Sequence, residues 1–385
     1  MTDFSLLTKV ILGLRGSSAL PEKVHSDEEH LIATLRWIER AHKVINQKGI
    51  SKGYDLLRAY WSPAYPETTG YTIPTLINAA TILHQPIWLE IAIRLAEYLL
   101  NCSNSDGAVV HWQDGSSGKP IVFDTGQVIF GWIAAYKATE DARFFTAANK
   151  AANWLASIQD PGGAWLKGQY LDVPKVIDTR VDWALLELNQ MVNSEGLKRA
   201  AIRNLEWAVS MQENDGWFNH CSFRHNEDPI THTLAYTAEG LVECGILLDD
   251  THFIDAGIRT LDALMNLQRS DGSIAATYSR GWHPTSTSSC LTGNCQLSRL
   301  WLLLHATTKK MEYRDASRNA LDFVLRTQEL RTENCDHFGA IAGSFPIFGS
   351  YERTKYPNWA AKFCADALIA FQTDLQESFF NLCPG

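Results

Sequence analysis

Carboxylates stand directly before two of the apolar segments that could form buried helices. Asp124 and Asp178 each precede a threonine, and Asp182 lies one helical turn beyond Asp178 in an otherwise apolar run. A buried charged carboxylate is costly unless it is paired, and two carboxyl groups that differ in protonation can cleave a glycosidic bond. We take these aspartates as candidate acid/base residues, although Asp-Thr is equally typical of a plain helix cap.

A histidine replaces the aspartate in the next such segment. His232 occupies the position that corresponds to Asp124 and Asp178, and Tyr236 follows it by one turn on the same face. A His–Tyr pair can abstract and relay a proton, which is the chemistry of a polysaccharide lyase or an epimerase. The alternative is a hydrogen-bonded histidine of the core.

Substrate contacts are expected from the same first turns and from the loops before them. Lys362 lies one turn into the last apolar run. A buried unpaired ammonium is untenable there, so Lys362 either contacts a substrate carboxylate or pairs with a nearby aspartate. We favour the first reading and expect Lys362 and Arg180 to contact a substrate carboxylate. The loop that holds Trp282 and His283 suits stacking on sugars. The expected substrate-binding residues are Tyr65, Glu67, Gln127, Arg180, Trp282, His283, Asn294, Tyr356, Asn358 and Lys362.

The segments that must position these residues form an internal repeat. Each is a polar cluster with Thr or Asn, followed by an apolar run of helical length. Thr69, Thr125, Thr179, Thr233 and Thr292 align at spacings of 56, 54, 54 and 59, and Asn358 follows after 66. Each aligned residue is a suitable N-cap, and a helix that is apolar nearly all round is buried. The predicted inner helices are 67–83, 124–138, 178–192, 231–248, 291–306 and 357–371.

A second set of helices, each with one apolar stripe, alternates with the first. The predicted outer helices are 29–46, 86–101, 141–158, 196–211, 252–267 and 312–327. Six buried helices alternating with six amphipathic ones predict an all-α fold, an (α/α)6 toroid of six inner and six outer helices. We expect a single domain over 29–372, a leader at 1–28 and a tail at 373–385. The inner helices all start at one end of the ring, where their dipoles favour carboxylates or an anionic ligand.

Composition limits the function classes. The net charge is −9 and no basic stripe is present, which excludes a nucleic-acid partner. No apolar run is long enough for a membrane span and no signal peptide is evident, so we expect a cytoplasmic protein without membrane insertion. Eight cysteines lack metal-site spacing and are expected to be reduced thiols, although Cys290 and Cys295 could bridge. No motif calls for a metal or a cofactor.

The linker segments resemble a known repeat. QDPGGAW (159–165) and QENDGWF (212–218) are similar to the repeat of triterpene cyclases and of the wider prenyltransferase/terpene-cyclase toroids. YTAEGL (236–241) also resembles the end of the Asp-Cys-Thr-Ala-Glu segment of oxidosqualene cyclases. The acid that protonates their substrate would fall on Ala235. The resemblance therefore implies a shared scaffold over roughly 86–280 and not a shared activity.

The whole chain looks most like the unsaturated glucuronyl and rhamnogalacturonyl hydrolases, which are six-hairpin glycosidases. Those enzymes place catalytic aspartates at the starts of the second and third inner helices, and the matching positions here are Asp124 and Asp178. The resemblance implies an enzyme that hydrolyses an acidic, uronate-containing oligo- or polysaccharide, with Asp182 tuning the pair.

Three alternatives remain open at this point. The first is a polysaccharide lyase or uronyl C5-epimerase that uses His232 and Tyr236. The second is a terpene-cyclase-like protein, and the third is a non-catalytic sugar-binding scaffold. The sequence does not determine the oligomeric state.

Overall fold

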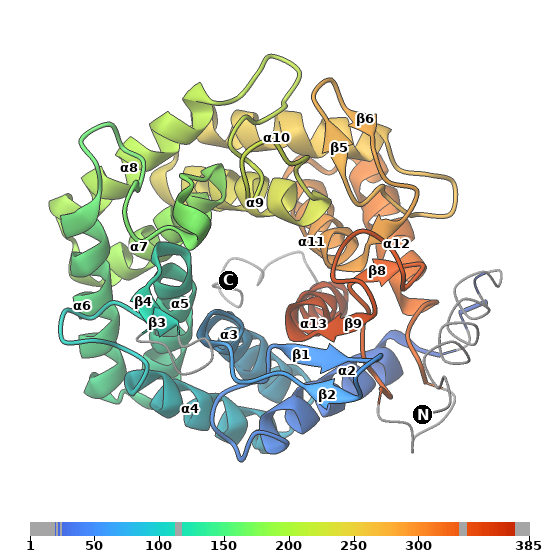
Figure 1. The fold of residues 1–385 in the computed structure, drawn as a ribbon, viewed down its shortest axis with the longest axis horizontal. Helices are drawn as coiled ribbons and strands as arrows, with labels where there is room; N and C mark the ends of the chain where they lie inside the picture. The colour runs from blue at the N-terminus through green and yellow to red at the C-terminus, as the bar shows by residue number, and fades with distance from the viewer. Residues whose placement is uncertain (1–19, 21, 24, 112–117, 331–336, 374–385) are drawn as a thin grey trace.

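The computed structural model describes residues 20, 22–23, 25–111, 118–330 and 337–373. Within them, helices form two concentric layers of one ring (Figure 1), which confirms the predicted (α/α)6 toroid. The inner helices are α3 (Pro66–Ile82), α5 (Val122–Thr139), α7 (Thr179–Val192), α9 (Thr231–Leu248), α11 (Leu291–Thr308) and α13 (Asn358–Gln372). The outer helices are α2 (Asp27–Lys43), α4 (Pro86–Leu100), α6 (Ala142–Ile158), α8 (Glu195–Ser210), α10 (Thr251–Asn266) and α12 (Met311–Leu325). The ring thus runs from Asp27 to Gln372, and most of the proposed leader and nearly all of the tail lie outside the described residues.

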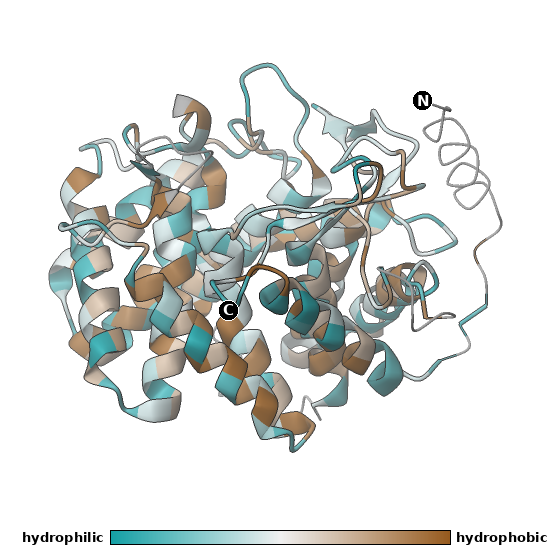
Figure 2. Ribbon diagram, turned by 60° about the horizontal axis from the view of Figure 1, so that its bottom comes forward, coloured by the Kyte–Doolittle hydropathy of each residue, from teal (hydrophilic) through white to brown (hydrophobic). Residues whose placement is uncertain are grey.

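The two layers differ in how the sequence specifies them. Four of the outer helices, α2, α6, α8 and α10, begin at side-chain caps. Ser26 forms a capping box with Glu29, and Ser194 accepts from a backbone N–H of α8. Hydrophilic and hydrophobic residues are interspersed along the helices in Figure 2. Inner helices are instead buried on all sides, and α5 is buried from Val122 to Ala135. No helix among the described residues is long and apolar enough to cross a membrane.

The expectation that the aligned residues are N-caps is wrong for all six inner helices, because each aligned residue lies inside its helix. The N-caps are Tyr65, Ile121, Asp178, Ile230, Cys290 and Pro357. Thr125 lies inside the first turn, where its hydroxyl donates to the carbonyl of Ile121, the actual N-cap, at 2.7 Å. The same hydroxyl accepts from the backbone N–H of Val109 at 3.0 Å, and Thr69 makes equivalent bonds in α3. These threonines therefore fasten the preceding loop segment to the start of an inner helix.

The glutamine of each linker joins one repeat to the next. The Gln159 amide donates to the carbonyl of Gly163 in its own turn and to that of Ala200 in α8, both at 2.8 Å. Gln212 likewise donates to Ala256 of α10 at 2.7 Å. Gly163 has φ 96°, and a Cβ there would lie 2.3 Å from a carbonyl oxygen of α8. The glutamine and glycine of this linker motif therefore fasten neighbouring outer helices to each other.

Short strands cover the end of the ring where the inner helices begin (Figure 1). β1 (Gly53–Asp55) pairs antiparallel with β2 (Tyr60–Trp61) and with β9 (Lys355–Pro357), so that Tyr54 lies opposite Tyr356. This sheet joins the first repeat to the last and closes the ring. Two-stranded pairs are formed by β3 (Val110–His111) with β4 (Lys119–Pro120), β5 (Tyr278–Ser279) with β6 (His283–Pro284), and β7 (Ser289–Cys290) with β8 (Ser344–Phe345).

The described cysteines are free thiols, as expected. Cys290 and Cys295 do not form a disulfide, and the sulfur of Cys290 accepts from the backbone N–H of Gly293 at 3.4 Å. Cys335 and Cys383 lie outside the described residues.

Replacing Gly240 by Ala is expected to destabilise the ring. A Cβ at Gly240 in α9 would lie 2.4 Å from the backbone of Thr179 and 2.5 Å from its hydroxyl. Overpacking of this kind costs roughly 1–3 kcal/mol, which urea denaturation measures. The matched control is Gly196→Ala in α8, an exposed position where alanine is expected to stabilise by up to about 1 kcal/mol. Equal effects of the two substitutions would contradict the close contact.

Candidate active site

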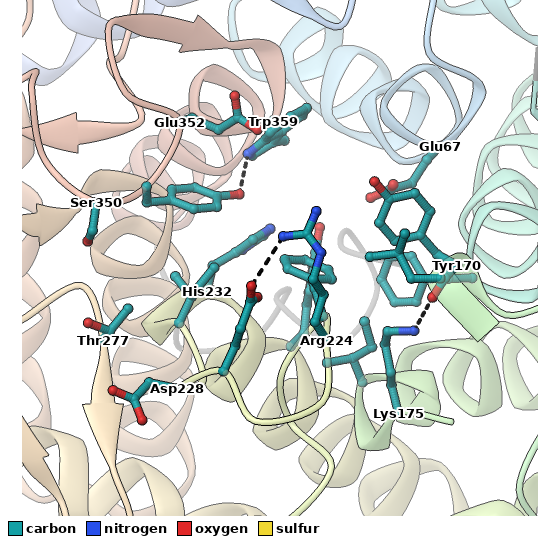
Figure 3. Close-up of a pocket in the computed structure, with 18 of the residues that line it drawn as sticks. Glu67, Tyr170, Lys175, Arg224, Asp228, His232, Thr277, Ser350, Glu352 and Trp359 are labelled. Carbon is teal, nitrogen blue, oxygen red and sulfur yellow. Dashed lines mark hydrogen bonds and ion pairs between the residues drawn. The ribbon is translucent and has the colours of Figure 1, made fainter. Parts of the chain in front are cut away.

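A cavity of about 610 Å³ opens where the inner helices begin. This volume lies within the usual range for sites that enclose a small ligand. Five of the residues expected at the site line it: Tyr65, Glu67, Asp124, His232 and Tyr236. Figure 3 shows Glu67 and Lys175 across the cavity from Ser350 and Thr277, with His232 between the two sides.

Glu67 and Asp124 form a carboxyl pair in this cavity. Glu67 lies in the first turn of α3 and Asp124 in the first turn of α5, and both side chains are buried. Burial and the neighbouring charge of Asp124 raise the pKa of Glu67 to about 8, against the opposing effects of a hydrogen bond with Tyr65 and the charge of Lys52. Glu67 therefore holds a proton at neutral pH beside a second carboxyl group, an arrangement suited to acid/base chemistry.

His232 and Tyr236 lie next to each other on the wall formed by α9. Their ring centroids are 4.2 Å apart, and Nδ1 of His232 is 2.6 Å from the side-chain oxygen of Gln296. Burial lowers the pKa of His232 to about 4, so the ring is neutral at physiological pH. The predicted His–Tyr pair thus faces the same cavity as the carboxyl pair.

Arg180 lies behind this wall and does not line the cavity. Its guanidinium is fully buried, pairs with Glu239 and donates from Nε to Gln127 at 3.0 Å. It also lies 4.9 Å from the ring centroid of Tyr236. Arg180 and Gln127 were expected to touch substrate, but the ion pair and the hydrogen bond direct them into the protein interior.

Lys362 is likewise turned toward a protein partner. Its ammonium lies 2.6 Å from a carboxylate oxygen of Asp366, one turn along α13, and 4.2 Å from the ring centroid of Phe363. Burial lowers its pKa. Neither of the two expected carboxylate-binding cations therefore lines the cavity.

Asp178 and Asp182 lie deeper in the protein than Asp124. The Gln169 amide, which lines the cavity, donates to Asp178 at 2.6 Å, and burial raises the pKa of Asp178 to about 7. Asp182 is fully buried, and neither of its oxygens has a hydrogen-bond partner among the described residues. Burial, and secondarily the charge of Asp178, raise its pKa well above the ordinary value. Of the three aspartates, only Asp124 lines the cavity.

Two expected asparagines hold loops in place. Asn294 accepts from the hydroxyl of Ser289 at 2.9 Å and donates to the carbonyl of Gly272 at 3.2 Å. Asn358 donates to the carbonyl of Ser51 at 2.5 Å. Both side chains are buried and neither lines the cavity.

Three expected aromatic residues also lie outside the cavity lining. The ring of Tyr356 stacks on His337 with a centroid separation of 5.6 Å. The indole of Trp282 donates to the carbonyl of Asp215 at 3.0 Å, and His283 is exposed on β6. Their loops belong to the mouth end of the ring, but these side chains face other parts of the protein.

Several cavity residues were not predicted. The ammonium of Lys52 lies 5.2 Å from the ring centroid of Tyr65 and 5.8 Å from that of Trp359, whose indole donates to the Tyr351 hydroxyl at 2.9 Å. Lys52 stands immediately before β1, and the pairing of β1 with β9 brings it beside α13. This pairing links distant parts of the chain, and helical periodicity carries no signal for it.

The opposite rim is rich in hydroxyl groups. Thr285 donates to Thr277 at 2.9 Å, and Ser350 donates to Ser286 at 3.2 Å. Thr277, Thr285 and Ser350 line the cavity. From this loop only Trp282 and His283 were predicted to contact the substrate, and neither lines the cavity.

Lys175 is hydrogen-bonded to the loop segment that contains Tyr170 and Val173. Its ammonium donates to the carbonyls of Tyr170 and Val173, the latter at 2.6 Å. No group of three or more His, Cys, Asp or Glu side chains that could hold a metal ion occurs within the described part of the chain.

Comparison with known proteins finds similarity in fold. No family model matches the chain, and no curated protein matches it in sequence. Among solved structures, an unsaturated glucuronyl hydrolase from Bacillus sp. GL1, responsible for the degradation of glycosaminoglycan, is similar at 13% identity and a TM-score of 0.73, over 91% of this chain and 98% of that chain. Cellobiose 2-epimerase from Bacillus thermoamylovorans is similar at 11% identity and a TM-score of 0.71, over 94% and 99%.

A third solved structure, an unsaturated glucuronyl hydrolase specific for heparin, matches at 14% identity and a TM-score of 0.71, over 90% and 96% of the two chains. The chain therefore has the α/α-toroid fold of these proteins, and the expected resemblance to the glucuronyl hydrolases is confirmed at the level of the fold. At these identities the likeness establishes the fold alone.

Asp182→Asn is expected to stabilise the protein increasingly as the pH rises from 4 to 8. An aspartate is ordinarily ionised above about pH 4, whereas burial raises the pKa of Asp182 well above its ordinary value. Between these two pKa values the folded state binds more protons than the unfolded state, so stability falls with rising pH. The stabilisation by Asp182→Asn, measured by urea denaturation, should therefore be larger at pH 8 than at pH 4. Asp255→Asn on exposed α10 should show no such trend. A stabilisation by Asp182→Asn that does not depend on pH would contradict the raised pKa of Asp182.

Proposed function

We propose that the protein is a carbohydrate-active enzyme that cleaves an acidic oligo- or polysaccharide by hydrolysis. The observation that carries the proposal is the carboxyl pair of Glu67 and Asp124 in an aromatic-lined cavity. Glycosidic cleavage needs one carboxyl group that gives a proton and one that acts as base or nucleophile. Glu67 fits the first role and Asp124 the second. The solved structures of similar fold, described as glucuronyl hydrolases, support this reading.

The pair differs from the one expected from sequence. Asp178 was the expected partner of Asp124, but Gln169 stands between Asp178 and the cavity. We therefore assign the acid role to Glu67 and a supporting role to Asp178, which orients Gln169.

Lys52 is the proposed recognition group for the acidic substituent of the sugar. It lines the cavity beside Tyr65 and Trp359, and its charge acts on Glu67. The flat faces of these aromatic rings suit stacking against a sugar ring, while the hydroxyl rim across the cavity suits a neutral sugar unit. A terpene-cyclase-like role fits poorly, because the cavity is lined by several ionisable side chains.

A second candidate function is a lyase or a uronyl epimerase. The observation that favours it is the contact between His232 and Tyr236 in the same cavity. In this reading His232 abstracts the proton next to the sugar carboxylate and Tyr236 relays a proton. The two candidates use different walls of one cavity, so substitutions can separate them.

The first test is turnover of a panel of acidic oligosaccharides, followed by new reducing ends and by the ultraviolet absorbance of an unsaturated uronate. Hydrolysis predicts reducing ends without absorbance. Glu67→Gln and Asp124→Asn should each lower kcat by about 10²–10⁴-fold, the usual contribution of general acid/base catalysis. Asp255→Asn is the control. A gain in absorbance that is lost in His232→Ala but retained in Glu67→Gln would contradict hydrolysis and support the lyase reading.

The second test concerns recognition of the acidic group. Lys52→Met should raise KM for an acidic oligosaccharide by about 10–100-fold, because a charged hydrogen bond contributes roughly 1.5–3 kcal/mol. The kcat should change little, and a neutral analogue of the same length should bind the variant and the wild type equally. An equal loss with the neutral analogue would show that Lys52 acts on the cavity structure and not on the substrate charge.

A further inference from the structure

We propose that Gln296 is a positioning residue that holds His232 in the neutral tautomer with its proton on Nδ1, leaving Nε2 as the acceptor that faces the sugar. The inference rests on the proposed function only in taking the occupant of the cavity to be a sugar. Its basis is the 2.6 Å contact between Nδ1 and the Gln296 side-chain oxygen, with both residues buried.

The tautomer follows from hydrogen-bond chemistry. An amide oxygen can only accept, so Nδ1 of His232 must donate, and a neutral imidazole then has its lone pair on Nε2. Gln296 lies in the second turn of α11 and reaches across to the first turn of α9. His232 projects into the cavity from there (Figure 3).

Packing alone does not account for a glutamine at this position. The amide nitrogen of Gln296 is buried and has no hydrogen-bond partner within the described residues. A buried donor without a partner is unfavourable, and a methionine of similar size would avoid it. The amide is therefore best explained by the oxygen that it offers to His232.

The surrounding groups favour a neutral ring. Arg180 from α7 disfavours a second positive charge nearby, and burial acts in the same direction. Glu239 on α9 opposes both effects, but it is already ion-paired with Arg180 and with Arg299. The remaining titratable neighbours stay protonated because burial raises their pKa: Tyr236, Cys290 and Tyr351. None of these groups is a hydrogen-bond partner of Nδ1 of His232, and Gln296 has that role.

A second histidine–glutamine contact in the chain serves as a matched comparison for the contact between His232 and Gln296. Nδ1 of His30 in α2 also lies 2.6 Å from a glutamine oxygen, that of Gln328. That pair is in the outer layer and does not line the cavity. Its histidine signals serve as an internal reference in every variant of Gln296.

The experiment is NMR of the full chain with ¹⁵N-labelled histidine, in which the two ring nitrogens report the tautomer directly. The signals of His232 are assigned by their loss in His232→Gln. We expect the Nδ1–H form in the wild type, and a mixture of tautomers in Gln296→Met. In Gln296→Glu the new carboxylate should accept the same hydrogen bond and raise the pH at which the ring takes up its second proton. His30 should be unchanged throughout.

Activity provides the second readout. In the lyase or epimerase reading, in which His232 abstracts a proton, Gln296→Met should lower kcat by about 10–100-fold with little change in KM, the size of effect seen when the hydrogen-bond partner of a metal-bound histidine is removed. Gln296→Glu should shift the acidic limb of the pH profile upward. A merely structural role would not move this limb.

The outcomes separate this inference from the proposed function. An Nε2–H tautomer in the wild type, or a tautomer unchanged in Gln296→Met, overturns the role of Gln296 even in an active enzyme. Failure to turn over any sugar, with the Nδ1–H tautomer present and dependent on Gln296, contradicts the proposed function and leaves the tautomer assignment standing.

Discussion

Neighbouring inner helices touch through glycines that lie within about one turn of the residues lining the cavity. A Cβ at Gly70 would lie 2.6 Å from the backbone of Val128 in α5, and one at Gly126 would lie 2.9 Å from Val181 in α7. These contacts allow the inner helices to pack backbone against backbone. The first turns of α3, α5 and α9 consequently converge on one small cavity, and the chemistry depends on that convergence.

The same convergence brings ionisable groups together among buried side chains. Burial and the neighbouring charge of Asp124 together raise the pKa of Glu67. Where a carboxylate meets cations, it stays ionised: Glu239 pairs with Arg180 and with Arg299, and these charges lower its pKa against the opposing effect of burial. Arg180, Glu239 and Arg299 therefore form a network of ion pairs behind Tyr236, whereas Glu67 and Asp124 line the cavity in front of it. This separation explains how one fold can hold many buried charges and still present a few of them to a substrate.

Sequence periodicity was sufficient to predict the ring, because six buried and six amphipathic helices have one simple closed arrangement. It also predicted which end carries the cavity, and so identified Tyr65, Glu67, Asp124, His232 and Tyr236. All five lie immediately before, or in the first two turns of, inner helices.

The errors arose where a side chain pairs with another residue of the protein and not with the substrate. Lys362 was expected at the cavity because it stands in an apolar run, yet its partner Asp366 lies one helical turn along, a spacing visible in the sequence. Arg180 pairs with Glu239 on the neighbouring helix, which only the packing of α7 on α9 defines. Lys52 and Tyr351 come from segments next to short strands, whose pairing is set by ring closure and leaves no periodic signal.

Glu67 carries a proton at neutral pH because it is buried and because Asp124 stands beside it. Infrared difference spectroscopy between the wild type and Glu67→Gln tests this most directly, since a protonated carboxyl group has a carbonyl band that an ionised one lacks. The account predicts a protonated band from Glu67 at pH 7 that disappears as the pH rises through about 8, and that disappears at lower pH in Asp124→Asn. An ionised Glu67 at pH 7, or a band unaffected by Asp124→Asn, would contradict it.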